Sequence, residues 1–137
     1  MGLVYADIEL VNAVDEGLRR RGKLREAEVR RLTARALVDS GAGLLVIPEN
    51  VAVQLDLVEV DQREIRTADG RSLRAPICGP VEIRFANRLA IGNAAVLGNQ
   101  VLLGAIPLEE LDVLIDPRNE KLIVNPEAPN MASVKVV

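Results

Sequence analysis

The sequence predicts a mainly β domain with one or two short helices. Hydrophobic residues make up 49% of the 137 residues but aromatic residues only 1%, so the core must consist of Val, Leu, Ile and Ala, which favours strands. Short apolar runs alternate with turn signals along most of the chain. An Ile-Pro pair follows an apolar run twice, and each pair is expected to begin a short helix.

A chain of this length is expected to form a single domain over residues 1–137. We expect its core to span about residues 3–124 and residues 126–137 to form a C-terminal tail. The tail ends in a strand-like run, residues 132–137, that is free to pair with another strand.

The first half of the chain predicts a long hairpin. Apolar and polar side chains alternate over about residues 3–13, which predicts the first strand. Residues 15–23 contain two glycines and many charges, and they are expected to form an exposed excursion. A second strand is predicted over about residues 27–38, with a helical turn at 24–30 as an alternative for its beginning.

The next stretch predicts a short helix and a second hairpin. Residues 44–47 are expected to form a short buried strand, and Pro48 the first turn of a helix that ends near residues 55–57. The strongest hairpin signal in the chain is the Asp-Gly turn inside residues 64–73. The remaining predicted elements are strands at about 81–86, 89–97 and 100–103, a helix that begins near Ile106-Pro107, and a closing hairpin of 114–117 with 121–124.

Composition excludes several kinds of functional site. The chain has no histidine, which excludes Ser-His-Asp and Cys-His nucleophiles and histidine-containing zinc sites, and we expect neither a metal nor another cofactor. Cys78 is the single cysteine, so no intrachain disulfide forms, and we interpret it as a small core residue. The net charge of −3 and the scarcity of aromatic residues argue against nucleic-acid binding. Without a membrane-length apolar run or a signal-peptide pattern, we expect a cytoplasmic protein.

About half of the basic residues lie between Arg19 and Arg35. Because acidic residues are interleaved with them, we interpret this stretch as a solvated loop and strand face. The alternative is a surface that docks an acidic partner or substrate segment.

One carboxylate is placed at the end of an apolar strand, in the run Ala36-Leu37-Val38-Asp39-Ser40-Gly41-Ala42. A carboxylate at a buried strand end loses hydration, which makes it a candidate for acid or base chemistry. The simpler alternative is a strand that ends at an ordinary Asp-Ser-Gly turn. A weak internal repeat adds to the pattern, since Val101-Leu102-Leu103-Gly104 stands before Ile106-Pro107 much as the Asp39 run stands before Ile47-Pro48. Only the first copy carries a carboxylate.

The Asp39 run, the Asp-Gly hairpin and the run that ends at Gly104 together resemble the retropepsin-like aspartic proteases, especially small bacterial members with one domain. The resemblance extends from about Val29 to Val124. It implies a closed β-barrel of short strands, the acid protease fold, and a homodimer in which each chain contributes one aspartate. The C-terminal tail would then be a candidate strand of the dimer interface.

The resemblance also implies roles for individual residues. Asp39 would be the catalytic carboxylate, Ser40 would form a hydrogen bond across the dimer axis, and Gly41 would permit the turn, with Ala42 beside them. Leu103 and Gly104 would brace the Asp39 loop. A flap over the substrate would be formed by Thr67, Ala68, Asp69, Gly70 and Arg71.

The function implied is an aspartic endopeptidase that hydrolyses a peptide or protein substrate as a homodimer. The sequence departs from the family at Ser40, where many relatives have Thr, and at the flap tip, which has little apolar surface. Two alternatives remain at this point. One is a catalytically silent dimerisation or peptide-binding module of the same fold, and the other is a β domain whose arginine-rich stretch binds a partner.

Overall fold

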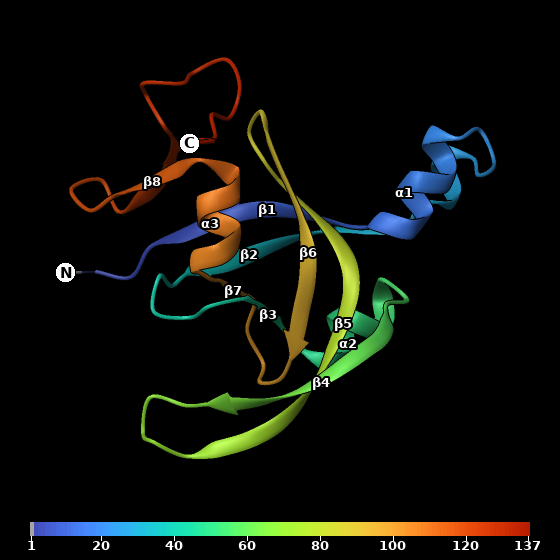
Figure 1. Cartoon of the computed structure of the whole chain (residues 1–137), viewed down its shortest axis with the longest axis horizontal. Coiled ribbons are helices and arrows are strands. Elements are labelled where there is room, and N and C mark those ends of the chain that lie inside the picture. The colour runs from blue at the N-terminus through green and yellow to red at the C-terminus, as the bar shows by residue number, and fades with distance from the viewer. Residues whose placement is uncertain (1) are drawn as a thin grey trace.

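The computed structural model describes residues 2–137, and its main element is a strongly curved seven-stranded sheet (Figure 1). In the first half of the chain the elements are β1 (Tyr5–Asn12), α1 (Ala13–Arg20), a 3-10 helix η1 (Glu26–Glu28), β2 (Arg31–Val38), β3 (Leu45–Ile47) and α2 (Glu49–Gln54). The second half contains β4 (Val58–Arg66), β5 (Ser72–Phe85), β6 (Arg88–Val96), β7 (Leu102–Leu103), α3 (Ala105–Leu111), β8 (Val113–Asp116) and β9 (Lys121–Val124).

The large sheet closes on itself. Its strand order is β1-β2-β7-β3-β6-β5-β4, and β1 pairs not only with β2 but also with β5. The ring therefore runs from β1 through β2, β7, β3, β6 and β5 back to β1, while β4 extends from it as the partner of β5. This confirms the mainly β, closed arrangement, and β8 and β9 form a separate two-stranded sheet.

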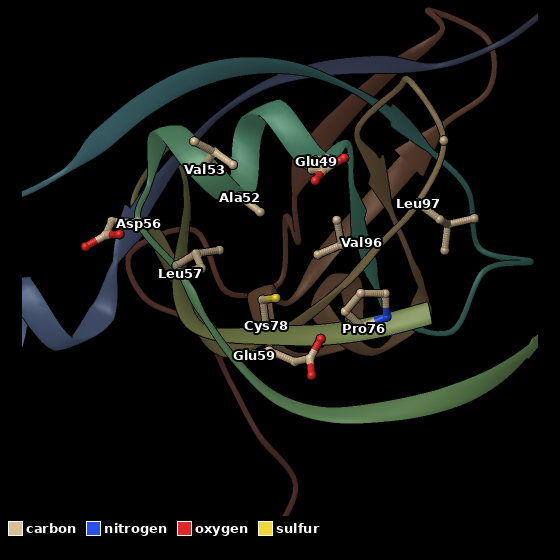
Figure 2. A pocket seen from close by; sticks show the side chains of 11 residues that line it. Glu49, Ala52, Val53, Asp56, Leu57, Glu59, Pro76, Cys78, Val96 and Leu97 are labelled. Carbon is tan, nitrogen blue, oxygen red and sulfur yellow. The ribbon is translucent and has the colours of Figure 1, made fainter. Parts of the chain in front are cut away.

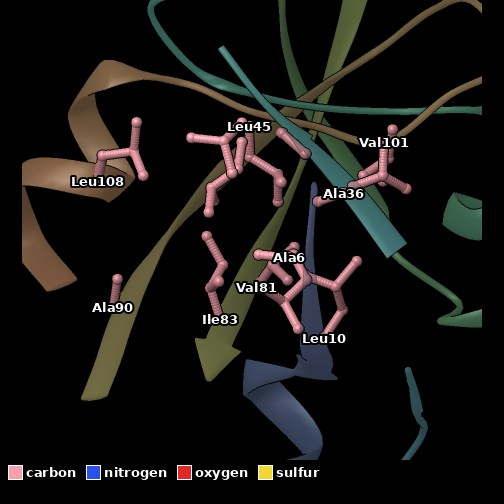
Figure 3. Packing of buried hydrophobic residues seen from close by; sticks show 14 of the residues in the cluster. Ala6, Leu10, Ala36, Leu45, Val81, Ile83, Ala90, Val101 and Leu108 are labelled. Atoms are coloured by element: carbon pink, nitrogen blue, oxygen red, sulfur yellow. The ribbon is translucent and has the colours of Figure 1, made fainter. Parts of the chain in front are cut away.

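The interior of the ring is filled by aliphatic side chains (Figure 3). The inward-facing residues of β1 are buried as their alternation predicts, with Ile8 and Leu10 exposed by no more than 1%. Leu45 and Ile47 of β3, and Leu103 of β7, are equally buried. Since β-branched and leucine side chains pack densely without polar atoms to satisfy, a core almost free of aromatic residues is still continuous.

The prediction for residues 15–23 is wrong for their first part, which belongs to the helix α1, whereas residues 20–23 are exposed as expected. Asn12 caps this helix by accepting a hydrogen bond from the Asp15 N–H at 3.0 Å. Asp15 and Glu16 are buried rather than exposed. The charged composition suggested contact with water, but Asp15 is paired with Arg30, and Glu16 is paired with Arg19 of the same helix and with Arg84 of β5.

A buried ionic network joins α1 to the seam between β1 and β5. Glu16 and Glu82 are both at most 1% exposed, and Arg84 donates to Glu16 at 2.9 Å and to Glu82 at 3.0 Å. Arg20 adds two hydrogen bonds to Glu82, at 2.6 and 3.1 Å. Burial alone would raise the pKa of Glu16, but the hydrogen bonds and charges of Arg19 and Arg84 hold it below its ordinary value. The arginine-rich stretch is thus only in part the solvated face that was expected.

The bounds of one expected strand need correction. The strand expected at 81–86 is the end of a much longer strand, β5, whose first half pairs with β4 and whose second half pairs with β1. Residues 132–137 form no strand within the described chain. The preceding part of the tail is held by hydrogen bonds, since Asn87 and Arg88 donate to the carbonyls of Pro129 and Ala128.

Changing Glu16 to Gln is expected to lower the free energy of unfolding at neutral pH by about 2 kcal/mol, because a buried, charge-assisted hydrogen-bond acceptor is lost. A carboxylate whose pKa is lower in the folded than in the unfolded protein stabilises the fold above its unfolded pKa, about 4.3, and this stability is lost as the pH falls through the folded pKa. Urea denaturation of Glu16→Gln should therefore show a weaker loss of stability as the pH falls below about 4.3.

The matched control is Glu26→Gln, which changes an exposed carboxylate in the neighbouring η1 and should leave both quantities within about 0.5 kcal/mol. Identical pH dependence in Glu16→Gln and the unmodified protein would contradict the assignment of Glu16 to this network.

Candidate active site

The position of Asp39 is fixed by a parallel pair of strand ends. β2 pairs with β7 so that Leu37 lies opposite Leu102 and Val38 opposite Leu103. Beyond the pair, the Asp39 N–H donates to the Leu103 carbonyl at 3.0 Å. The backbone of Asp39 is therefore held by a segment more than sixty residues away, and its side chain begins where the sheet ends.

The loop after Asp39 leaves the carboxylate accessible. The Gly41 N–H donates to Asp39 Oδ1 at 2.9 Å, and the Ala42 N–H donates to the Asp39 carbonyl at 3.1 Å. Asp39 itself is half-buried and Ser40 is exposed. Among the residues that the structure describes, Asp39 Oδ2 has no hydrogen-bond partner, so one carboxylate oxygen is positioned by the loop and the other is free to bind.

Gly104 clamps the same loop from the other side. The N–H groups of Ala105 and Ile106, in the first turn of α3, donate to the carbonyls of Ala42 and Gly43 at 2.7 and 3.0 Å. A Cβ atom at residue 104 would stand 2.7 Å from the Ala42 carbonyl oxygen and closer still to that of Leu44. Only glycine allows this close backbone approach, which explains the residue type at this position.

The Asp39 loop forms one wall of a cleft of about 630 Å³. The opposite wall is the β4–β5 hairpin, which extends across the side of the molecule where the loop between β2 and β3 lies (Figure 1). Apolar side chains from β3, β6 and β7 line the floor. The cleft residues are Asp39, Gly41, Ala42, Gly43, Leu44, Val46, Glu64, Ile65, Arg66, Thr67, Ala68, Ala95, Leu97 and Leu102.

The structure brings only part of the expected flap to the cleft. Thr67 and Ala68 line it, whereas Asp69, Gly70 and Arg71 form the turn beyond it. This turn is stiffened by hydrogen bonds of the Thr67 hydroxyl to the Asp69 carboxylate and to the Arg71 carbonyl, and by a 2.7 Å ion pair of Arg71 with Asp69. The hydrogen bonds from Thr67 and Arg71 lower the pKa of Asp69.

Several cleft residues were not predicted from the sequence. Glu64, Ile65 and Arg66 belong to β4, and Val46 and Leu97 come from the floor. The hairpin signal around Asp69-Gly70 identified the β4–β5 hairpin, but the face of this hairpin that turns toward the cleft depends on how its long strands bend. Leu103 is fully buried beneath the loop and contributes its carbonyl rather than its side chain.

Residues 2–137 contain no group of three or more His, Cys, Asp and Glu residues arranged to hold a metal ion. In the same range, no helix has the length and apolarity needed to cross a membrane. The polar groups that line the cleft are the carboxylates of Asp39 and Glu64, the Arg66 guanidinium, the Thr67 hydroxyl and backbone amides.

A family model described as aspartyl protease matches residues 26–121. The chain belongs to the aspartyl protease family. Among solved structures, the chain is similar to the retroviral protease-like domain of Ddi1 from Leishmania major. The TM-score is 0.55 and the sequence identity is 15%, and the match covers 92% of this chain and 90% of that chain. This likeness confirms the retropepsin-like fold. A comparison with curated proteins found no match.

Changing Gly104 to Ala is expected to lower the free energy of unfolding by about 3 kcal/mol, since the new Cβ must push apart the backbone of the Asp39 loop and α3. The control is Gly43→Ala in the same loop, where an added Cβ meets nothing within 4 Å and φ is not positive. Thermal and urea denaturation should show the large loss only for Gly104→Ala. Equal losses for the two variants would refute the proposed clamp.

Proposed function

We propose that this protein is an aspartic endopeptidase that works as a homodimer, with Asp39 of each subunit as the catalytic carboxylate. The observation that carries the proposal is the placement of Asp39 at the wall of a peptide-sized cleft, on a loop held by the Leu103 carbonyl and Gly104. Membership of the aspartyl protease family supports the same reaction class.

The need for a second subunit follows from charge. Only one aspartate lines the cleft, and the other acidic residue, Glu64, lies on the flap strand. Aspartic peptidases use two carboxyl groups about 3 Å apart, which share one proton because both cannot ionise at that distance. A second copy of the chain is the simplest source of the missing carboxylate, since its own Asp39 is equally accessible.

In the proposed mechanism, a water molecule lies between the two Asp39 carboxyl groups. The ionised carboxylate removes a proton from this water, and the oxygen attacks the peptide carbonyl carbon. The protonated carboxyl group donates to the developing oxyanion and stabilises it. The proton that was removed from the water then passes to the amide nitrogen, and the C–N bond breaks to release an amine and a carboxylic acid. Ser40, exposed beside Asp39, would form the hydrogen bond across the dimer axis that the family resemblance implies.

The cleft is suited to an extended peptide. Val46, Ile65, Leu97 and Leu102 offer apolar surface for substrate side chains. The Thr67 N–H and carbonyl are already bonded to Arg71 and Gly70 in the turn, so a peptide that pairs with the flap by strand addition would use the backbone of Ala68. Closing of the flap would exclude bulk water and strengthen the electrostatic interactions at the carboxylates.

Changing Asp39 to Asn is expected to reduce peptide cleavage on the order of 10³-fold, because the amide cannot act as a base. Purified protein would be incubated with a mixed peptide library between mildly acidic and neutral pH, and products identified by mass spectrometry. Activity per subunit should fall on dilution, and an excess of Asp39→Asn subunits should suppress the unmodified protein by forming mixed dimers.

The matched control is Asp61→Asn, which changes an exposed aspartate on β4 outside the cleft and should retain activity. Cleavage that persists in Asp39→Asn would refute the catalytic assignment. Absence of cleavage by an intact dimer of the unmodified protein would favour a peptide-binding module of the same fold.

Replacing Ala42 with Ser is expected to move the acidic limb of the pH–rate profile to lower pH. A hydroxyl group at this position of the Asp39 loop can donate to the dyad and favour its charged form, which the alanine methyl group cannot do. The profile of kcat/KM reports the apparent pKa values of the pair rather than of either aspartate. Ala42→Gly serves as the control without a donor, and a shift of equal size in that variant would contradict the explanation.

A further inference from the structure

A second pocket of about 570 Å³ lies outside the Asp39 cleft (Figure 2). It is formed between α2, the base of the β4–β5 hairpin and the end of β6. Its volume is within the range of pockets that hold small ligands or single side chains of a partner. None of the proposed catalytic residues lines it.

The floor of this pocket is apolar. Ala52 and Cys78 are exposed by only 8% and 7%, and Leu57 and Val96 complete the surface around them. Figure 2 shows the Cys78 sulfur between α2 and the strands. Burial raises the pKa of the Cys78 thiol, and the negative charge of Glu59 adds to the effect. The thiol therefore stays neutral at neutral pH and acts as part of the apolar floor.

The rim is acidic. Glu59 lies directly opposite Cys78 in the β4–β5 pairing, and Glu49 lies at the start of α2 across the pocket (Figure 2). Both carboxylates are exposed, and neither has an ion-pair or hydrogen-bond partner within the described part of the chain. The third acid, Asp56, already lies 3.6 Å from Arg30. No Lys or Arg lines the pocket, so its negative electrostatic potential and apolar floor favour a ligand that carries a positive charge on an apolar stem.

Leu97 connects this pocket to the cleft, because it lines both. A polypeptide that leaves the cleft past Leu97 arrives at the acidic rim. We propose that the pocket binds a lysine or arginine side chain, next to an aliphatic residue, of an extended polypeptide. Identifying that polypeptide as a segment of the substrate outside the cleft rests on the proposed function; the binding itself does not. The aliphatic stem would cover the floor while the charged group pairs with Glu49 and Glu59.

The test uses the full chain carrying Asp39→Asn, so that no peptide is cleaved. Acetyl-Leu-Arg-Leu-amide and acetyl-Leu-Gln-Leu-amide would be titrated at low ionic strength while backbone amide shifts are followed by NMR. We expect saturable shifts at Ala52, Leu57 and Cys78 with the arginine peptide, and binding at least about threefold weaker with the glutamine peptide. Added salt should reduce the difference, because exposed ion pairs are screened.

The variant Glu49→Gln/Glu59→Gln should weaken binding of the arginine peptide about three- to tenfold and leave the glutamine peptide unaffected. Glu127→Gln, an exposed carboxylate of the tail, is the matched control. Equal binding of the two peptides, shifts confined to the Asp39 cleft, or unchanged affinity in the double variant would each overturn the proposal.

Cleavage assays with the unmodified protein separate this proposal from the catalytic one. If the unmodified protein cleaves peptides, a peptide with a basic residue at a position outside the cleft should have a lower KM and a similar kcat. In Glu49→Gln/Glu59→Gln this difference in KM should disappear. Specific binding without cleavage would support the pocket and count against the peptidase. If peptides are cleaved with a KM that does not depend on the basic residue, only the identification of the bound polypeptide as substrate would be overturned.

Discussion

The backbone contact between the Asp39 loop and the segment Leu103–Gly104 is the constraint on which the site depends. Asp39 donates to the Leu103 carbonyl, and the first N–H groups of α3 donate to the carbonyls of Ala42 and Gly43. These bonds satisfy groups that a loop end and a helix start would otherwise leave unpaired. They also require β7 to lie between β2 and β3, which the sheet order provides, and a residue without a side chain at position 104.

The closed sheet is what brings these two segments together, and its seam lies between β1 and β5. The buried carboxylates Glu16 and Glu82 sit at this seam, where Glu82 pairs in register with Val11. Arg84 contacts both carboxylates, so α1 is joined to the strands that close the ring. A buried ionic network adds little net stability compared with apolar packing, but it disfavours any register that would leave a charge unpaired. The charged helix can thus specify which strands close the sheet.

The sequence predicted those features that depend on local pattern. Alternation identified β1 and β2, the Asp69-Gly70 turn identified the β4–β5 hairpin, and the runs ending at Asp39 and Gly104 identified the loop and its support. It missed α1, because Asp15 and Glu16 have arginine partners that only the folded chain brings near. It also missed Glu64 and Leu97 as cleft residues. Their position depends on the bend of the β4–β5 ribbon, which no local pattern determines.

The β4–β5 hairpin relates the two proposed sites to each other. Its tip carries Thr67 and Ala68 over the Asp39 cleft, and its base carries Glu59 and Cys78 at the second pocket. The ribbon is paired from Val58 to Arg66, with one irregularity between Glu59 and Asp61 next to the base. A group bound between α2 and Glu59 would restrict the ribbon at this weaker point, and the stiff turn held by Thr67 and Asp69 would move with it. Under the proposed function, a basic side chain at the base would therefore favour particular positions of the flap over the scissile bond, so that substrate selection and flap closure act through one element.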